Sequence, residues 1–165
     1  MKTGNLQLIR AQTDGTRGVN DGIDIVREVK ELPQRARGRA CVVLTHDYTE
    51  QKVWASKLAA QTDAQHIDLL DHFASDPDLV EGLGGISIPK LFALLSSIAG
   101  PRILIVSGLE FLLATWAGQT DAMAKFGHQV EYWDGSLALL FVMQYDAVLA
   151  PRPFTRYPQY RFVVD

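Results

Sequence analysis

The chain has few of the features that stabilise exported or membrane-bound proteins. Its 165 residues include a single cysteine, Cys41, so no internal disulfide framework can form. No apolar run reaches the roughly 18 residues that a membrane-spanning helix requires. The first residues, MKTGNLQLIR, lack the long apolar stretch of a signal peptide. We therefore expect a protein of the reducing cytoplasm that does not associate with membranes.

An excess of charge of one sign is also missing from the chain as a whole. The formal net charge is −3, and 47% of the residues are hydrophobic, which is too apolar for a disordered chain. The charge is unevenly distributed, with net values of +3 over residues 1–39, −8 over residues 40–150 and +2 over residues 151–165. No broad basic face for nucleic acid is evident, although the two basic ends could meet in the fold.

Short apolar runs alternate with amphipathic stretches along most of the chain, which is typical of an α/β protein with a mainly parallel sheet. We expect a three-layer fold, with the sheet flanked by helices, as a single domain over residues 20–165. Residues 1–19 are interpreted as a mobile arm or one short strand. The expected strands are 41–44, 66–70, 102–106, 137–143 and 160–164, and the expected helices are about twelve residues ending at Pro33, 52–61, 88–99, 109–118 and 120–132.

Several residues have expected structural roles within this frame. Ser87 can cap the helix 88–99, and Gly100 stands where that helix should stop. Cys41 lies in an apolar strand and should be a buried hydrophobe. Trp54, Trp116 and Trp133 are expected to pack in the core and between helices.

The segment after the first strand has the position of a phosphate-binding loop, between a strand and a helix. Laying G-x-x-x-x-G-K-[ST] over residues 46–53 aligns Lys52 with the motif lysine. His46 and Gln51 replace the two glycines, and Val53 replaces the hydroxyl that would hold magnesium. The glycines let backbone N–H groups wrap a phosphate, so ordinary nucleotide binding is not expected, and a surface lysine is the simpler interpretation of Lys52.

The third strand also lacks the acidic residue with which an active NTPase of this class ends it. Ser107 stands there, and the nearest carboxylate is Glu110. Catalytic and structural roles both stay open for Glu110, and a capping or exposed helix-start role is favoured because the helix dipole stabilises a carboxylate there.

The segment HIDLLDH places four metal-capable side chains together: His66, Asp68, Asp71 and His72. On a strand, His66 and Asp68 would share one face. The spacing matches no standard zinc signature, so we expect no metal and no other cofactor.

The tail PRPFTRYPQYRFVVD concentrates arginine and aromatic residues among three prolines. It is either a stiff connection to the last strand or an interface for another protein or, less favourably, for single-stranded nucleic acid. The interface candidates are Arg152, Phe154, Arg156, Tyr157 and Arg161.

The order of these features resembles the small P-loop-type BrxF proteins of bacteriophage-exclusion (BREX) systems. The resemblance runs over most of residues 20–165 and is carried by the strand–loop–helix with Lys52, then RILIVSGLEFLL, LALLFVMQY and PQYRF. The strings HIDLLDHF and IVSGLEFLL also resemble BrxB, a larger non-catalytic protein of related systems. In the BrxF family the phosphate loop is glycine-rich and the strand before SGLE ends in aspartate, so only Lys52 and Glu110 correspond to its nucleotide site. The resemblance implies a P-loop-NTPase-like frame with degenerate Walker motifs, in phage defence with other protein subunits as partners.

Three hypotheses follow for function. The first is a non-catalytic interaction or scaffold subunit of an anti-phage defence system, which contacts DNA indirectly if at all and is compatible with a homo-oligomer. The second is an atypical nucleotide-binding ATPase that uses Lys52 and Glu110. The third is a nucleic-acid-binding accessory protein that uses the basic terminal segments.

Overall fold

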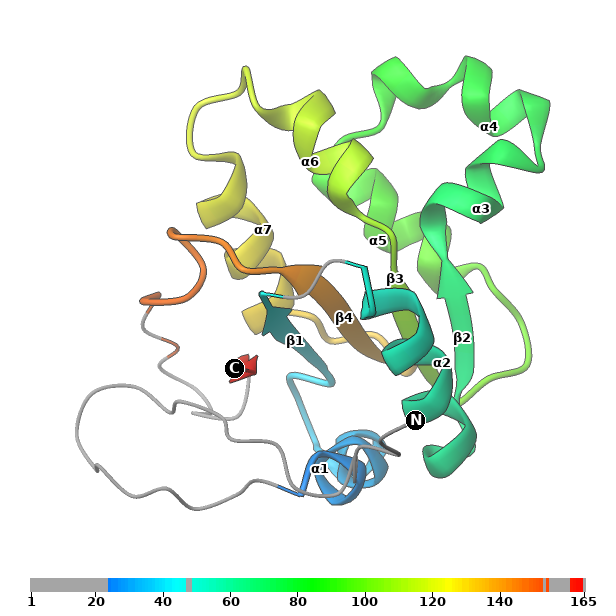
Figure 1. The fold of residues 1–165 in the computed structure, drawn as a ribbon, viewed down its shortest axis with the longest axis vertical. Helices are drawn as coiled ribbons and strands as arrows, with labels where there is room; N and C mark the ends of the chain where they lie inside the picture. Colours follow the sequence, from blue (N-terminus) through cyan, green and yellow to red (C-terminus); the bar gives the residue numbers. More distant parts are fainter. Residues whose placement is uncertain (1–23, 47–48, 153, 155–160, 165) are drawn as a thin grey trace.

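A computed structural model of the chain describes residues 24–46, 49–152, 154 and 161–164 (Figure 1). The expected arm, residues 1–19, lies outside these residues. The helices are α1 (Ile25–Glu31), α2 (Gln51–Thr62), α3 (Leu69–Ala74), α4 (Pro77–Glu81), α5 (Ile88–Ser96), α6 (Glu110–Trp116) and α7 (Ala122–Glu131), with the 3-10 turns η1 (Leu32–Gln34) and η2 (Leu83–Gly85). The strands are β1 (Ala40–Thr45), β2 (Gln65–Asp68), β3 (Ile103–Ser107), β4 (Ala138–Gln144) and β5 (Arg161–Val164).

The strands form one sheet in the order β2-β3-β4-β1-β5, and every adjacent pair is parallel. This confirms the expected α/β fold with a parallel sheet. Parallel pairing needs long crossover connections, which the helices supply. Because β4 inserts between β1 and β3, the loops that follow these three strands lie next to one another at the carboxyl edge of the sheet.

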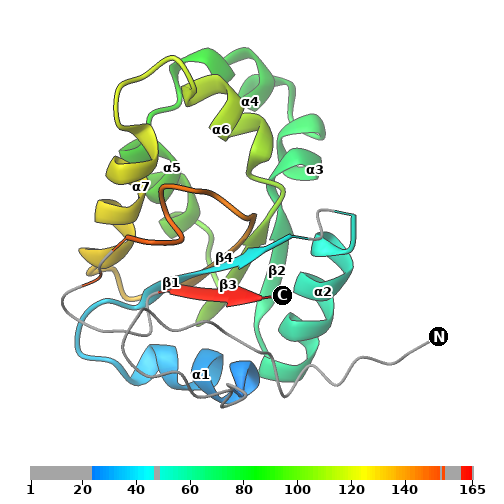
Figure 2. The same cartoon turned by 60° about the vertical axis from the view of Figure 1, so that its left-hand side comes forward.

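Helices cover both faces of the sheet, giving three layers (Figure 2). On one face, α1 and α2 pack over Cys41, Val43, Ile105 and Leu140. On the other face, the helices from α3 to α7 pack over the alternate residues of the same strands in the larger of the two cores. The central strands therefore bury both of their faces, which explains why they appear in the sequence as continuous apolar runs.

The sequence predicted several local features correctly. The Ser87 hydroxyl accepts a hydrogen bond from the Lys90 amide at 3.3 Å and so caps α5, as expected. The expected end of that helix was wrong, because α5 ends at Ser96 and Gly100, with a φ of 108°, lies in the connection beyond it. Cys41 is buried as expected, with 1% of its surface exposed. Of the three tryptophans, Trp116 is fully buried, whereas Trp54 and Trp133 pack against the two cores while staying partly exposed.

Two expectations about the segment between β2 and α5 were wrong. The strand expected over residues 66–70 ends at Asp68, because the Asp68 carboxylate accepts a hydrogen bond from the Asp71 amide at 3.1 Å and starts α3 there. The polar connection expected around Pro77 contains α4, which Asp76 caps by accepting from the Asp78 amide at 3.0 Å. Within the described residues, no helix has the length and apolar character needed to cross a bilayer.

Candidate functional site

The candidate site lies at the carboxyl edge of the sheet. There, the chain that follows β1 and the chain that follows β4 pass to opposite faces of the sheet. After β1 the chain enters α2, which belongs to the smaller core, whereas after β4 it reaches Leu149, which belongs to the larger one. In open parallel sheets, ligands bind in the crevice that such a divergence creates. The site is built from the start of α2, the turn after β3, the start of α6 and the end of β4.

Gln51, the first residue of α2, fills the space between these loops. Only 3% of its surface is exposed. Its side-chain amide donates a hydrogen bond to Oε1 of Glu110 at 2.8 Å, and its side-chain oxygen accepts one from the Gly108 amide at 3.2 Å. One glutamine side chain thus bonds both to the turn after β3 and to the first residue of α6.

Glu110 joins three segments rather than lying exposed at the start of a helix. Besides Gln51, its Oε1 accepts a hydrogen bond from the Gln144 amide at the end of β4 at 2.9 Å. The residue is half-buried, and its Oε2 is buried without a hydrogen-bond partner in the described part of the chain. The expected capping or exposed role is therefore incomplete, because the Glu110 carboxylate joins the start of α2 and the end of β4 to the start of α6.

Lys52 points away from this pair of residues. It forms an ion pair with Asp71 of α3, and about half of each side chain is exposed, at 57% and 61%. The hydrogen bond to Asp71 raises the pKa of Lys52, so the ammonium is charged at neutral pH. The structure places Lys52 with Asp71 and Glu110 with Gln51, so the two residues of the nucleotide-site hypothesis have different partners.

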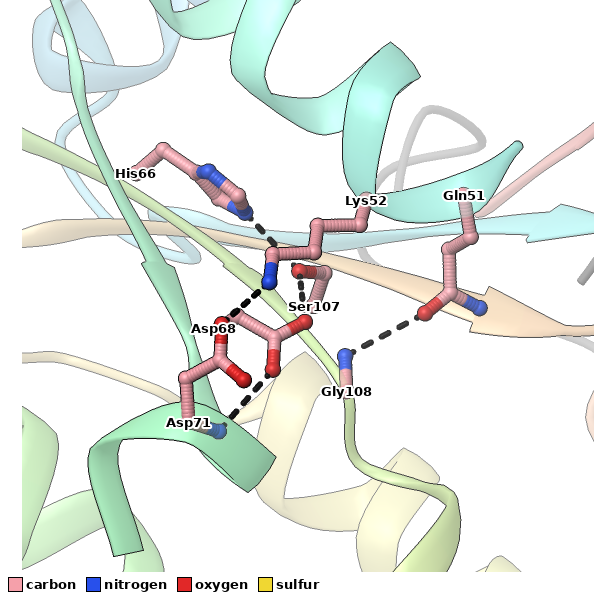
Figure 3. Close-up of polar contacts among 7 residues, drawn as sticks. All are labelled: Gln51, Lys52, His66, Asp68, Asp71, Ser107 and Gly108. Carbon is pink, nitrogen blue, oxygen red and sulfur yellow. Dashed lines mark hydrogen bonds and ion pairs between the residues drawn. The ribbon is translucent and has the colours of Figure 1, made fainter. Parts of the chain in front are cut away.

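A second polar cluster lies on the neighbouring strands β2 and β3 (Figure 3). Asp68 pairs with Ser107 in the parallel register, and the Ser107 hydroxyl donates to Oδ2 of Asp68 at 2.9 Å. The His66 ring nitrogen Nε2 lies 2.8 Å from the same hydroxyl oxygen. The expectation that His66 and Asp68 share a face is met, and Ser107 completes the cluster.

The direction of these hydrogen bonds decides what the cluster can do. A serine hydroxyl carries one proton, and Ser107 donates that proton in its hydrogen bond to Oδ2 of Asp68. His66 must then donate its Nε2 proton to Ser107. A histidine that donates to the hydroxyl cannot remove a proton from it, so this arrangement is not that of an activated serine nucleophile.

The environment of His66 favours its neutral form. Burial lowers the pKa of His66, and the nearby Asp68 carboxylate opposes that effect only in part. His66 is therefore a neutral donor at pH 7. In the described residues, no group of three or more His, Cys, Asp or Glu side chains is arranged to hold a metal ion.

Gly108 connects the two clusters, and only glycine fits there. Its φ is 71°, and a Cβ placed on it would lie 2.7 Å from both Asp68 carboxylate oxygens. Its amide donates to Gln51 on the other side. The sequence carries no signal for this role, because residues 51, 68 and 108 become neighbours only in the folded sheet.

The interface candidates of the tail are only partly described. Arg152 forms an ion pair with the buried Glu131 at 3.4 Å, and its guanidinium lies over the Phe154 ring, 5.4 Å from the centroid. The Arg152 side chain also packs closely on Gly127 of α7. Arg156 and Tyr157 lie outside the described residues, and Arg161 is the first residue of β5. Arg152 therefore attaches the start of the tail to α7, while Phe154 packs against the Arg152 guanidinium and the larger core.

Comparison with known proteins adds no relative to this description. No protein-family model matches the chain, and no curated protein matches it.

Proposed function

We propose that this protein is a non-catalytic interaction or scaffold subunit built on a degenerate P-loop-like α/β domain. The observation that carries the proposal is the placement of Gln51. In the P-loop alignment Gln51 stands at the second glycine, and its buried side chain bonds to Gly108 and Glu110.

This arrangement opposes phosphate binding in two ways. A P-loop holds phosphate with successive backbone N–H groups, which requires glycine where the chain must approach the ligand closely. Here a glutamine side chain lies at that point, and its partner Glu110 is a carboxylate. Glu50 immediately precedes Gln51 in the chain. Negative charge at this edge would repel a triphosphate.

The lysine of the motif also lacks the orientation that nucleotide binding needs. Lys52 bonds to Asp71 rather than facing the loop after β3. A lysine that serves a P-loop reaches the β- and γ-phosphates. In this protein the Lys52 ammonium pairs with Asp71 and so links α2 to α3.

The resemblance to BREX proteins supports phage defence in the cytoplasm as the setting, with other protein subunits of the defence complex as partners. The proposal is tested by co-expressing the tagged chain with the products of its neighbouring genes. Stable co-purification with one of these products, in the absence of nucleotide, is the expected result. A chain that purifies alone and hydrolyses ATP would overturn the proposal.

One observation favours the ATPase alternative, with Lys52 and Glu110 as its site residues. The buried Oε2 of Glu110 has no hydrogen-bond partner in the described residues, and a carboxylate oxygen is a ligand that magnesium accepts. If this alternative holds, Glu110→Gln and Lys52→Ala each abolish ATP turnover. If the scaffold proposal holds, neither substitution alters the recovery of the partner protein.

A further inference from the structure

The segment from α3 to η2, residues 69–85, projects from the body of the protein and has a surface of its own. In Figure 1 it lies at the upper right, with α4 at the far side from the sheet. Helix α4 packs mainly on α3 and η2, and neither α4 nor η2 contains a buried residue. We call residues 69–85 the α3–α4 lobe.

The α3–α4 lobe is attached to the core by few side chains. Leu69 and Phe73 of α3 are buried in the larger core, whereas Leu79 and Leu83 only pack against it from the outside. A helix of five residues has little stability of its own in water. Helix α4 therefore depends on its Asp76 cap and on Leu79, and its outer side faces no other part of the described chain.

Two large aliphatic side chains of the lobe are exposed to solvent. About half of the Leu70 surface and of the Val80 surface is exposed, at 49% and 51%. Val80 lies between Asp78 and Glu81 on α4, and Leu70 precedes Asp71 on α3. These two aliphatic side chains offer apolar surface that a partner protein can bury.

The lobe itself contributes four carboxylates and no lysine or arginine, although Lys90 from outside it donates a hydrogen bond to the Gly85 carbonyl oxygen at 3.2 Å. No lysine or arginine occurs between Lys57 and Lys90, whereas Asp71, Asp76, Asp78 and Glu81 all fall within the lobe. Asp71 has Lys52 as its partner, and Asp76 caps α4. The carboxylates of Asp78 and Glu81 form no ion pair in the described residues, so they are available to a cation from outside.

We propose that the α3–α4 lobe is the docking surface for a basic, amphipathic segment of a partner protein. Aliphatic side chains of the segment would cover Val80 and Leu70, and its lysine or arginine side chains would pair with Asp78 and Glu81. This inference rests on the proposed scaffold function and names the chemistry of the partner. Complementary charge steers such an encounter and selects the partner, and apolar burial supplies the free energy that holds it.

The test uses the full chain and a short amphipathic peptide of lysine and leucine as the probe. Binding is measured by fluorescence anisotropy for the wild type, for Val80→Ser and for the double variant Asp78→Asn, Glu81→Gln. Asp76 is left unchanged because it caps α4. The matched control is Asp63→Asn, Asp134→Asn, which removes the same charge from exposed positions outside the lobe. Asparagine tolerates the left-handed conformation of residue 63, where φ is 54°.

The proposal predicts that the double variant and Val80→Ser each weaken peptide binding by about tenfold or more, whereas the control pair changes it by less than about twofold. A peptide in which serine replaces leucine should bind the wild type and Val80→Ser equally. If the control pair weakens binding as much as the lobe variants do, general acidity explains the binding and the proposal is overturned. The far-ultraviolet circular dichroism of each variant verifies that it is folded.

Failure of the proposed docking surface can be distinguished from failure of the proposed scaffold function. If the lobe variants leave peptide binding unchanged and the protein still co-purifies with a neighbouring gene product without nucleotide, only the docking surface is wrong. If the chain purifies alone and hydrolyses ATP, the scaffold function itself is wrong, whatever the peptide does.

Discussion

The Gln51 side chain donates to Oε1 of Glu110 across 2.8 Å, joining the first residue of α2 to the first residue of α6. The two residues are 59 positions apart in the sequence. The bond closes the carboxyl edge of the sheet at the point where a phosphate-binding loop would need open backbone. Four properties of this edge and of the core beneath it can be measured directly.

Glu110 should be needed for its hydrogen bonds and not for its charge. Glu110→Gln keeps an oxygen that accepts from Gln51 and Gln144, and it replaces the buried carboxylate oxygen that has no partner with a neutral amide nitrogen. We expect the free energy of unfolding of this variant to stay within about 1 kcal/mol of the wild-type value. Glu110→Ala leaves the Gln51 amide and the Gln144 amide without their acceptor, and we expect it to cost about 1–3 kcal/mol. Urea unfolding at pH 7 measures both, and equal losses would refute the distinction.

Gly108 should tolerate no side chain. An alanine Cβ would lie 2.7 Å from the Asp68 carboxylate oxygens, and alanine rarely adopts a φ of 71°. We expect Gly108→Ala to destabilise the fold by roughly 2 kcal/mol or more. The control is Gly118→Ala, since a Cβ at residue 118 meets nothing within 4 Å, and it should change stability by no more than about 0.5 kcal/mol. Similar unfolding midpoints for the two variants would contradict the close approach to Asp68.

His66 should make stability fall in mild acid. Burial lowers the pKa of His66 in the folded state, so the unfolded chain binds more protons as the pH drops below the ordinary histidine value of about 6.5. The contribution of His66 is therefore fully present above that pH and decreases as the pH falls from there towards the folded-state pKa. His66→Gln keeps a donor for Ser107 without a titrating group. We expect the free energy of unfolding to fall more for the wild type than for His66→Gln when the pH is lowered from 7.5 to 5.5. A wild type that instead gains stability relative to the variant over this range would contradict the account.

Cys41 should be inert to thiol reagents in the folded protein. Burial raises the pKa of the Cys41 thiol to about 12, and the side chain lies within the smaller core. Only the thiolate is reactive, so modification requires opening of the sheet. We expect Ellman's reagent to react rapidly in denaturant and very slowly without it. Rapid reaction in native buffer would mean that β1 is more accessible than the structure shows.

The layers of the fold were predictable because burial on both faces gives the central strands an unmistakable composition. The apolar runs of β1, β3 and β4 predicted strands within one or two residues of their observed ends. The start of α5 was predictable from Ser87, because a helix cap is a local interaction, whereas Gly100 placed the end of the helix beyond its observed end at Ser96. Helix α4 was missed because five residues without a buried side chain carry no periodic pattern.

The candidate site was predictable only in part. The alternation of strand side chains correctly placed His66 and Asp68 on one face. Their contact with Ser107 required knowing that β2 and β3 are neighbours in register, and local patterns do not encode strand order. The bond between Gln51 and Glu110 was beyond prediction for the same reason, since a polar residue at a helix start has many possible partners.

The central claim, that the P-loop position holds no nucleotide, is tested most directly by calorimetric titration of the full chain with Mg·ATP. The account predicts no heat of binding for the wild type, and the same flat titration for Lys52→Ala. Micromolar binding by the wild type that disappears in Lys52→Ala and in Glu110→Gln would contradict it.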